Sequence, residues 1–81
     1  MLVITVSKAK DRAKMMLKSN KVTKADKKWL LFELNIIDDG ILLYESTGDP
    51  DCKSAVSLGI CEECDRINNF YNKVFMLKGA K

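Results

Sequence analysis

Residues 29–45 read WLLFELNIIDDGILLYE, and this apolar segment decides how the rest of the chain can fold. In an extended conformation, the even-numbered residues from 30 to 36 are all apolar and share one face of a strand. Asp39-Gly40 follows, and Asp-Gly between two apolar runs is typical of a β-hairpin turn. As a helix, the segment would be apolar almost all round, which is difficult to bury in an 81-residue protein. We therefore predict a hairpin with strands over 29–37 and 41–45, joined at 38–40.

The residues before this hairpin predict a strand and a helix. Residues 2–6, Leu-Val-Ile-Thr-Val, form a β-rich run, and Ser7 is a suitable N-cap for a following helix. Between residues 8 and 19, apolar side chains recur at helical spacing on one face, and lysines recur every fourth residue on another. Further on, Thr23 with Asp26 resembles a capping box.

A second helix is predicted after the hairpin, because Asp49-Pro50 is a suitable N-cap and first-turn pair. A continuous helix from 50 to 78 would be about 43 Å long. A compact domain of this size has a radius of gyration of only about 12 Å. We therefore predict that the helix either breaks near Gly59 or protrudes, and that Gly79 ends it. Its core face would be formed by Val56, Ile60, Cys64, Ile67, Tyr71, Val74 and Phe75.

These elements predict a single α+β domain over residues 1–81, in the order β-α-β-β-α. Two helices would cover one face of a mixed or antiparallel sheet, because each element must bury its apolar side against another. The alternative is a mainly α-helical protein with a small β-hairpin.

The charges divide unevenly along the chain. Residues 1–28 hold nine basic and two acidic residues, whereas residues 29–81 hold five basic and nine acidic ones. A molecule polarised in this way attracts polyanions or an acidic protein face. Trp29 follows the basic segment and is placed to stack on a base. The candidate residues for binding nucleic acid or an acidic partner are Lys10, Lys14, Lys18, Lys21, Lys24, Lys27 and Lys28.

The three cysteines suit a reducing compartment better than a disulfide framework, because their number is odd. Cys61 and Cys64 form a CxxC motif, and with Cys52 they are candidate zinc ligands. On an unbroken helix, Cys52 and Cys61 would lie about 13 Å apart along the axis, so a zinc site requires a break near Gly59. The other interpretation places Cys64 in the core. With no second CxxC motif, our main expectation is that the protein has no cofactor.

The sequence does not contain a recognisable catalytic set. It has no histidine, the commonest general base, and no glycine-rich phosphate loop. We therefore expect a protein that is not an enzyme and has no small-molecule substrate. No apolar run approaches the roughly 18 residues of a membrane helix, and the N-terminus lacks the order of a signal peptide. We predict a cytoplasmic protein without a membrane partner, in the host-cell cytoplasm if it is viral.

The function predicted from the sequence is that of a small non-enzymatic binding protein, a regulator, inhibitor or adaptor. It would act on a protein partner or self-associate. Met15, Met76 and Leu77 lie off the predicted core faces and are candidate interface residues. The alternatives are a nucleic-acid-binding module that uses the lysines and a small zinc-binding domain. So short a stand-alone protein would suit a viral or mobile-element origin.

Overall fold

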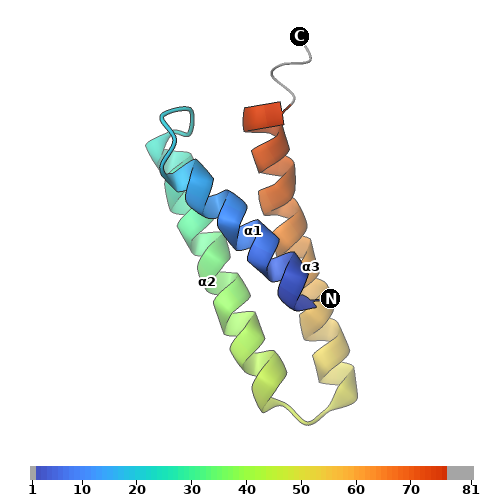
Figure 1. Cartoon of the computed structure of the whole chain (residues 1–81). Helices are drawn as coiled ribbons and strands as arrows, with labels where there is room; N and C mark the ends of the chain where they lie inside the picture. Colours follow the sequence, from blue (N-terminus) through green and yellow to red (C-terminus); the bar gives the residue numbers. More distant parts are fainter. Residues whose placement is uncertain (1, 77–81) are drawn as a thin grey trace.

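The chain folds into three α-helices, as shown by a computed structural model that describes residues 2–76, with side chains from residue 4 (Figure 1). Helices α2 and α3 form an antiparallel hairpin, and α1 crosses one face of this pair. A short π-helical segment, η1, extends α3. The bounds are α1 Leu2–Leu17, α2 Lys24–Ser46, α3 Pro50–Tyr71 and η1 Asn72–Met76.

The predicted α+β fold is wrong, because the described residues 2–76 contain no strand. The alternative is right that the protein is mainly α-helical, but its small hairpin is wrong, since both predicted hairpin strands and the turn at 38–40 lie inside α2. The helix begins at the pair that resembles a capping box, a start signal set aside when the strand was predicted: the Thr23 hydroxyl accepts a hydrogen bond from the Asp26 backbone N–H at 3.1 Å. Leu30, Ile37 and Ile41 recur at helical spacing and contribute to the core.

Helix α1 includes residues 2–6, for which a strand was predicted, so that prediction is also wrong. Val6 continues the core face that Ala9, Ala13 and Met16 form, and all four are buried. Ser7 therefore lies inside the helix, exposed, and not at its N-cap. The β-rich composition of residues 2–6 is overridden because the helical face buries Val6 against the other helices.

Helix α3 begins as predicted, with Asp49 at the N-cap and Pro50 in the first turn. The Asp49 carboxylate accepts a hydrogen bond from the Asp51 backbone N–H at 3.1 Å. The helix continues without a break through Gly59 to Tyr71. It fits an unbroken length because the protein is elongated, with extents of 46 × 24 × 15 Å. Gly79 lies outside the described residues.

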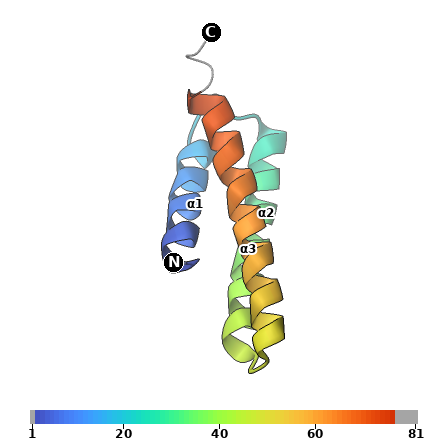
Figure 2. The same cartoon turned by 90° about the vertical axis from the view of Figure 1, so that its right-hand side faces the viewer.

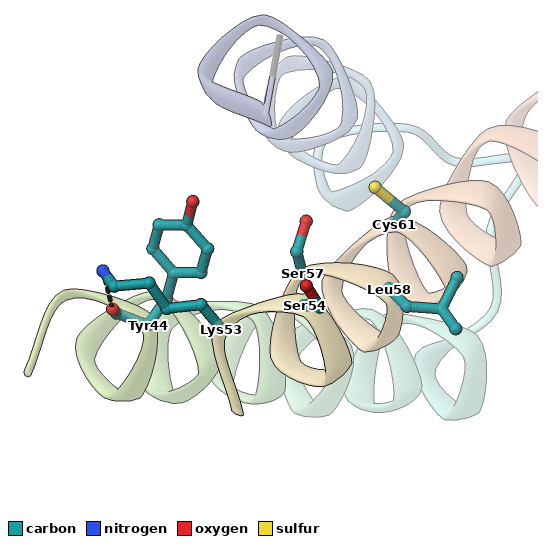
Figure 3. A pocket seen from close by; sticks show the side chains of 6 residues that line it. All are labelled: Tyr44, Lys53, Ser54, Ser57, Leu58 and Cys61. Carbon is teal, nitrogen blue, oxygen red and sulfur yellow. Dashed lines mark hydrogen bonds between the residues drawn. The ribbon is translucent and has the colours of Figure 1, made fainter. Parts of the chain in front are cut away.

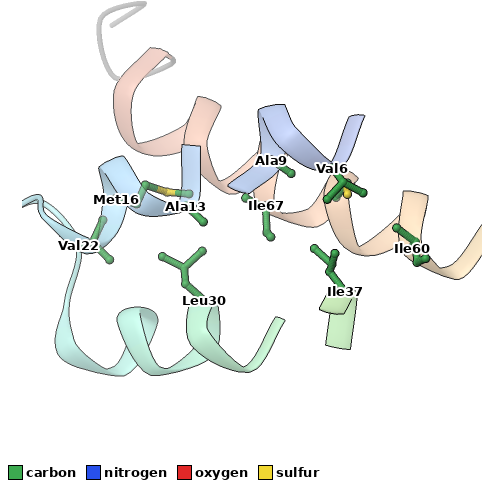
Figure 4. Packing of buried hydrophobic residues seen from close by; sticks show 10 residues of the cluster. Val6, Ala9, Ala13, Met16, Val22, Leu30, Ile37, Ile60 and Ile67 are labelled. Carbon is green, nitrogen blue, oxygen red and sulfur yellow. The ribbon is translucent and has the colours of Figure 1, made fainter. Parts of the chain in front are cut away.

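The three helices share one hydrophobic core, shown in Figure 4. At Ala9 and Ala13 the core side chains of α1 are small, so this part of α1 approaches the hairpin closely, while Met16 fills the core nearer the end of α1. Glu33 of α2 is also buried, at 3% exposure, and its Oε1 has no hydrogen-bond partner among the described residues. The buried apolar residues are Val6, Ala9, Ala13, Met16, Val22, Leu30, Ile37, Ile60, Cys64 and Ile67.

Polar contacts fix the position of α1 on the hairpin. The Lys10 Nζ lies 2.6 Å from Asp38 Oδ1 on α2, and the Arg12 guanidinium donates a 2.8 Å hydrogen bond to Asn68 on α3. Since Lys10 and Arg12 lie within one turn of α1, these contacts tie one segment of the helix to both members of the hairpin.

The α2–α3 contact depends on close approach at Gly40. A Cβ built on Gly40 would lie 2.9 Å from Ile60 Cγ1, nearer than side-chain carbons normally come. Near the opposite end of the pair, Trp29 packs edge-on against Phe70, with ring centroids 5.5 Å apart. The missing side chain at Gly40 therefore lets Ile60 pack directly on the backbone of α2.

Replacing Gly40 by alanine is expected to be less favourable than the same change at Gly59. Alanine is favoured over glycine inside a helix by up to about 1 kcal/mol. At Gly59 no atom lies within 4 Å of the new Cβ, so Gly59→Ala should raise the free energy of unfolding by about 0.5–1 kcal/mol. At Gly40 the displacement of Ile60 offsets or reverses this gain. Urea unfolding followed by circular dichroism compares the two variants, and equal stabilisation by both would contradict the close approach.

Candidate functional site

One side of α2 carries exposed apolar residues that none of the described helices covers. Phe32, Ile36 and Leu43 are separated by four and seven residues, a spacing that places them on one side of a helix. Phe32 is 61% exposed and Leu43 49% exposed, whereas Ile36 is half-buried. We call Phe32, Ile36 and Leu43 the outer row.

The outer row lies beside α3, on the face of the hairpin opposite α1. Ile36 comes four residues before Gly40 and Leu43 three residues after it, so both adjoin the side of α2 that contacts α3. The contact with α1 is made by Asp38, on a different side of α2. Figure 2 shows α1 on one side of the α2–α3 pair and no helix on the other. The outer row is therefore part of an open surface.

The neighbouring side of α3 carries small and charged residues. Ala55, Gly59, Glu62 and Arg66 are separated by four, three and four residues and so share one side of α3. Arg66 comes four residues before Phe70, which packs on α2, so this side adjoins α2. The open surface thus combines large apolar side chains from α2 with small and charged ones from α3.

Opposite charges gather at the two ends of the long axis. Residues 14–28, at the α1–α2 connection, hold six lysines and one aspartate. Residues 38–51, at the α2–α3 turn, hold five acidic residues and no basic one. These two segments lie at opposite ends of α2 in Figure 1, so the molecule is polarised along its length. The charge division seen in the sequence therefore becomes a basic end, residues 14–28, and an acidic end, residues 38–51.

The seven candidate lysines do not all belong to this basic end. Lys10 lies earlier on α1 and forms the ion pair with Asp38. Lys21 Nζ lies over the ring of Phe75, 5.4 Å from its centroid. Trp29, which sequence reasoning offered for base stacking, is half-buried against Phe70. The other lysines are exposed, apart from the half-buried Lys27: they are Lys14, Lys18, Lys24 and Lys28.

The two described methionines of the predicted interface are both exposed, Met15 by 53% and Met76 by 62%. Met15 lies on α1 near the C-terminal end of α3, where the Tyr71 hydroxyl donates to its sulfur at 3.9 Å. The Arg12 guanidinium packs over the same tyrosine ring, 5.2 Å from its centroid. Leu77, the third predicted interface residue, lies outside the described residues.

A shallow pocket of about 380 Å³ lies between the acidic end and the start of α1 (Figure 3). The Lys53 ammonium group donates to the Tyr44 carbonyl oxygen at 2.9 Å and lies 4.4 Å from the centre of the Tyr44 ring. The lining supplies hydroxyls and a thiol but no carboxylate to activate them. The lining residues are Tyr44, Lys53, Ser54, Ser57, Leu58 and Cys61.

The cysteines do not meet the geometric condition for a zinc site. That condition was a helix break near Gly59, and α3 continues unbroken through this residue. No cluster of three acidic, cysteine or histidine ligands occurs within residues 2–76. Cys64 is buried in the core, as its place on the apolar face predicted. Burial raises the pKa of the Cys64 thiol to about 11, and the nearby Cys61, Asp65 and Glu63 add to the shift.

Sequence reasoning missed the outer row because it assigned residues 29–37 to a strand. The signal was present in the spacing of Phe32, Ile36 and Leu43, which matches a helix through the predicted turn. A helix over residues 29–45 would be apolar almost all round, and this observation counted as evidence against a helix. It equally indicates a helix with an exposed apolar side.

Comparisons of the chain with protein-family models, curated proteins and solved structures find no match. Within the described part of the chain, the helices lack the length and apolar character that crossing a bilayer requires. The candidate site therefore has to be interpreted from its own geometry and charge.

The raised pKa of Cys64 predicts an order of thiol reactivity. Thiolates are the reactive species, and at pH 8 a thiol with a pKa of about 11 is ionised to only about one part in a thousand. Cys52 and Cys61, both half-buried, should therefore react with iodoacetamide before Cys64 in the folded protein. Mass spectrometry of peptides after timed labelling measures the three rates. Labelling of Cys64 as fast as Cys52 at pH 8 would contradict its buried position, and unfolding in urea provides the control in which all three react.

Proposed function

We propose that this protein is a non-enzymatic binding module, a regulator, inhibitor or adaptor, that docks on a protein partner through the outer row of α2. The observation that carries the proposal is the distribution of apolar side chains around this helix. A helix that is apolar on every side is normally buried on every side. Here α1 and α3 cover only part of the circumference, and Phe32 and Leu43 remain exposed.

The surroundings of the outer row support a protein partner. Protein interfaces combine an apolar centre, in which aromatic residues are enriched, with a polar rim. Phe32 provides an aromatic side chain within such a surface, next to Ile36. Glu62 and Arg66 on α3, with Asp39 on α2, provide charged groups at its edge. Apolar residues at this spacing also allow α2 to pack against a helix or a groove of another protein.

Serine substitution of Phe32 and Leu43 should weaken binding without unfolding the monomer. Central interface residues typically contribute about 2 kcal/mol or more, so the double variant should bind at least about a hundredfold less tightly. Because both side chains are exposed, helicity by circular dichroism should not change. A photo-crosslinking amino acid at position 32 detects the partner in cells of the source, and the yield should fall when Leu43 is replaced.

The matched control places the same crosslinker at Leu58, which is 63% exposed on α3 and outside the outer row. Equal adducts from positions 32 and 58 would show non-specific contact and contradict the proposal. Absence of any adduct from position 32 would contradict it as well.

A second candidate function is nucleic-acid binding at the basic end, and it has its own supporting observation. Lys24, Lys27 and Lys28 lie in the first turns of α2, where the positive end of the helix dipole favours acidic residues. No ion pair joins these lysines to an acidic group among residues 2–76. The positive charges of these lysines repel one another and the positive end of the helix dipole. A bound polyanion would offset this repulsion.

Charge reversal at Lys18 tests this second candidate. If the basic end contacts phosphates, Lys18→Glu should weaken binding to single- or double-stranded nucleic acid and reduce the log–log salt slope by about 0.7–0.9 per lost contact. Lys8→Glu is the matched control, because it makes the same charge change at an exposed lysine of α1, outside the basic end, whereas Lys18 directly follows α1. Fluorescence anisotropy at several salt concentrations measures both. Equal effects of the two variants would contradict a specific basic site.

A further inference from the structure

We propose that the partner of the outer row is a second copy of this chain, packed antiparallel so that each basic end lies against the acidic end of the other copy. This inference rests on the proposed function and names its partner. It follows from the balance of buried and exposed residues on α2 and from the charges at its two ends.

Within one copy, α2 exposes more large apolar side chains than it buries completely. Leu30 and Ile37 are the large apolar residues of α2 in the buried core. Four others are about half exposed or more, and they are Leu31, Phe32, Leu42 and Leu43. A core in a chain of this length rarely contributes more than about 3–5 kcal/mol, and association with another copy is a common supplement. Covering the outer row would thus add apolar burial that one copy lacks.

The charges select the second copy and its orientation. The six lysines and one aspartate of the basic end give a net charge of +5. The five acids of the acidic end give −5, which Lys10, paired with Asp38, and Lys53, packed on Tyr44, reduce to −3. In a parallel pair, like ends would meet and repel. In an antiparallel pair, both contacts join opposite charges, so the surface is complementary to itself. A two-fold axis supplies this arrangement, since each contact then occurs twice.

The outer row is suitably placed for such an axis. Ile36 lies near the middle of α2, whose bounds are Lys24–Ser46, with Phe32 on the basic side and Leu43 on the acidic side. An axis passing near Ile36 brings this residue close to its own copy. It also brings Phe32 toward the half of the partner helix that carries Leu43. The small residues Ala55 and Gly59 on the adjoining side of α3 leave space for a helix from the second copy.

The mass of the protein in solution tests this inference directly. Sedimentation equilibrium over the micromolar range should give a mass that rises toward twice that of one chain as concentration increases. Phe32→Ser with Leu43→Ser should increase the dissociation constant by at least about a hundredfold. A mass that stays at one chain throughout this range would overturn the inference.

Leu42→Ser is the matched control for the outer row. Leu42 neighbours Leu43 on the same helix and is 66% exposed, but it lies four residues after Asp38 and so faces the α1 side. Its replacement should leave the dissociation constant within about threefold of the original value. Equal weakening by Leu42→Ser would overturn the assignment of the interface to the outer row.

Charge exchange tests the antiparallel orientation. Lys24→Glu with Lys28→Glu should weaken association at low salt, and adding Asp39→Lys with Asp51→Lys should restore it. The weakening should diminish at about 1 M salt, where charges more than about 3 Å apart are screened. Failure of the second pair of substitutions to restore association would overturn the antiparallel arrangement.

Crosslinking from position 32 separates the failure of this inference from the failure of the proposed function. Adducts between two copies of the chain support the inference. Adducts formed only with other proteins overturn the inference while the outer row remains a protein-binding surface. No adduct at all overturns both.

Discussion

Helix α2 carries apolar side chains on more of its circumference than two neighbouring helices can cover. Leu30 and Ile37 face the shared core, while Phe32 and Leu43 face away from it. Helix α3 runs beside α2 without a break, and α1 covers only one face of the pair. The long α2–α3 pair makes the molecule elongated, and the incomplete covering of α2 leaves its surface open.

Local signals in the sequence predicted the helix ends only in part. The cap at Asp49 was identified correctly, because a cap depends on residues within one turn of each other. The start signal at Thr23 was noted but set aside in favour of a strand, and the N-cap predicted at Ser7 lies inside α1. The core face of α3 was also predicted correctly, since its spacing runs through several turns. The hairpin was wrong because the Asp39-Gly40 turn signal is equally local, whereas the outcome was decided by contact between Gly40 and Ile60. No short-range pattern reports a contact between residues so far apart in the chain.

The candidate site was predictable only in part for the same reason. The exposure of Met15 and Met76 followed from their positions off the core faces. The pairing of Lys10 with Asp38 did not, because it depends on how α1 crosses α2. The outer row was excluded by the assumption that an apolar helix must be buried within its own chain. In this chain that assumption fails, because Phe32 and Leu43 of α2 are exposed.

Because α2 is apolar on several sides, hydrophobic burial alone does not determine which side faces inward. A rotation of the helix would exchange some apolar residues for others at little cost in buried area. The contacts that do discriminate are specific: Gly40 fits against Ile60, and Asp38 reaches Lys10. Both would be lost if α2 turned to bury Phe32 or Leu43. The interactions that give α2 a single orientation are thus the same ones that hold the outer row outside the core. Its exposure follows from how the hairpin is specified and not from loose packing.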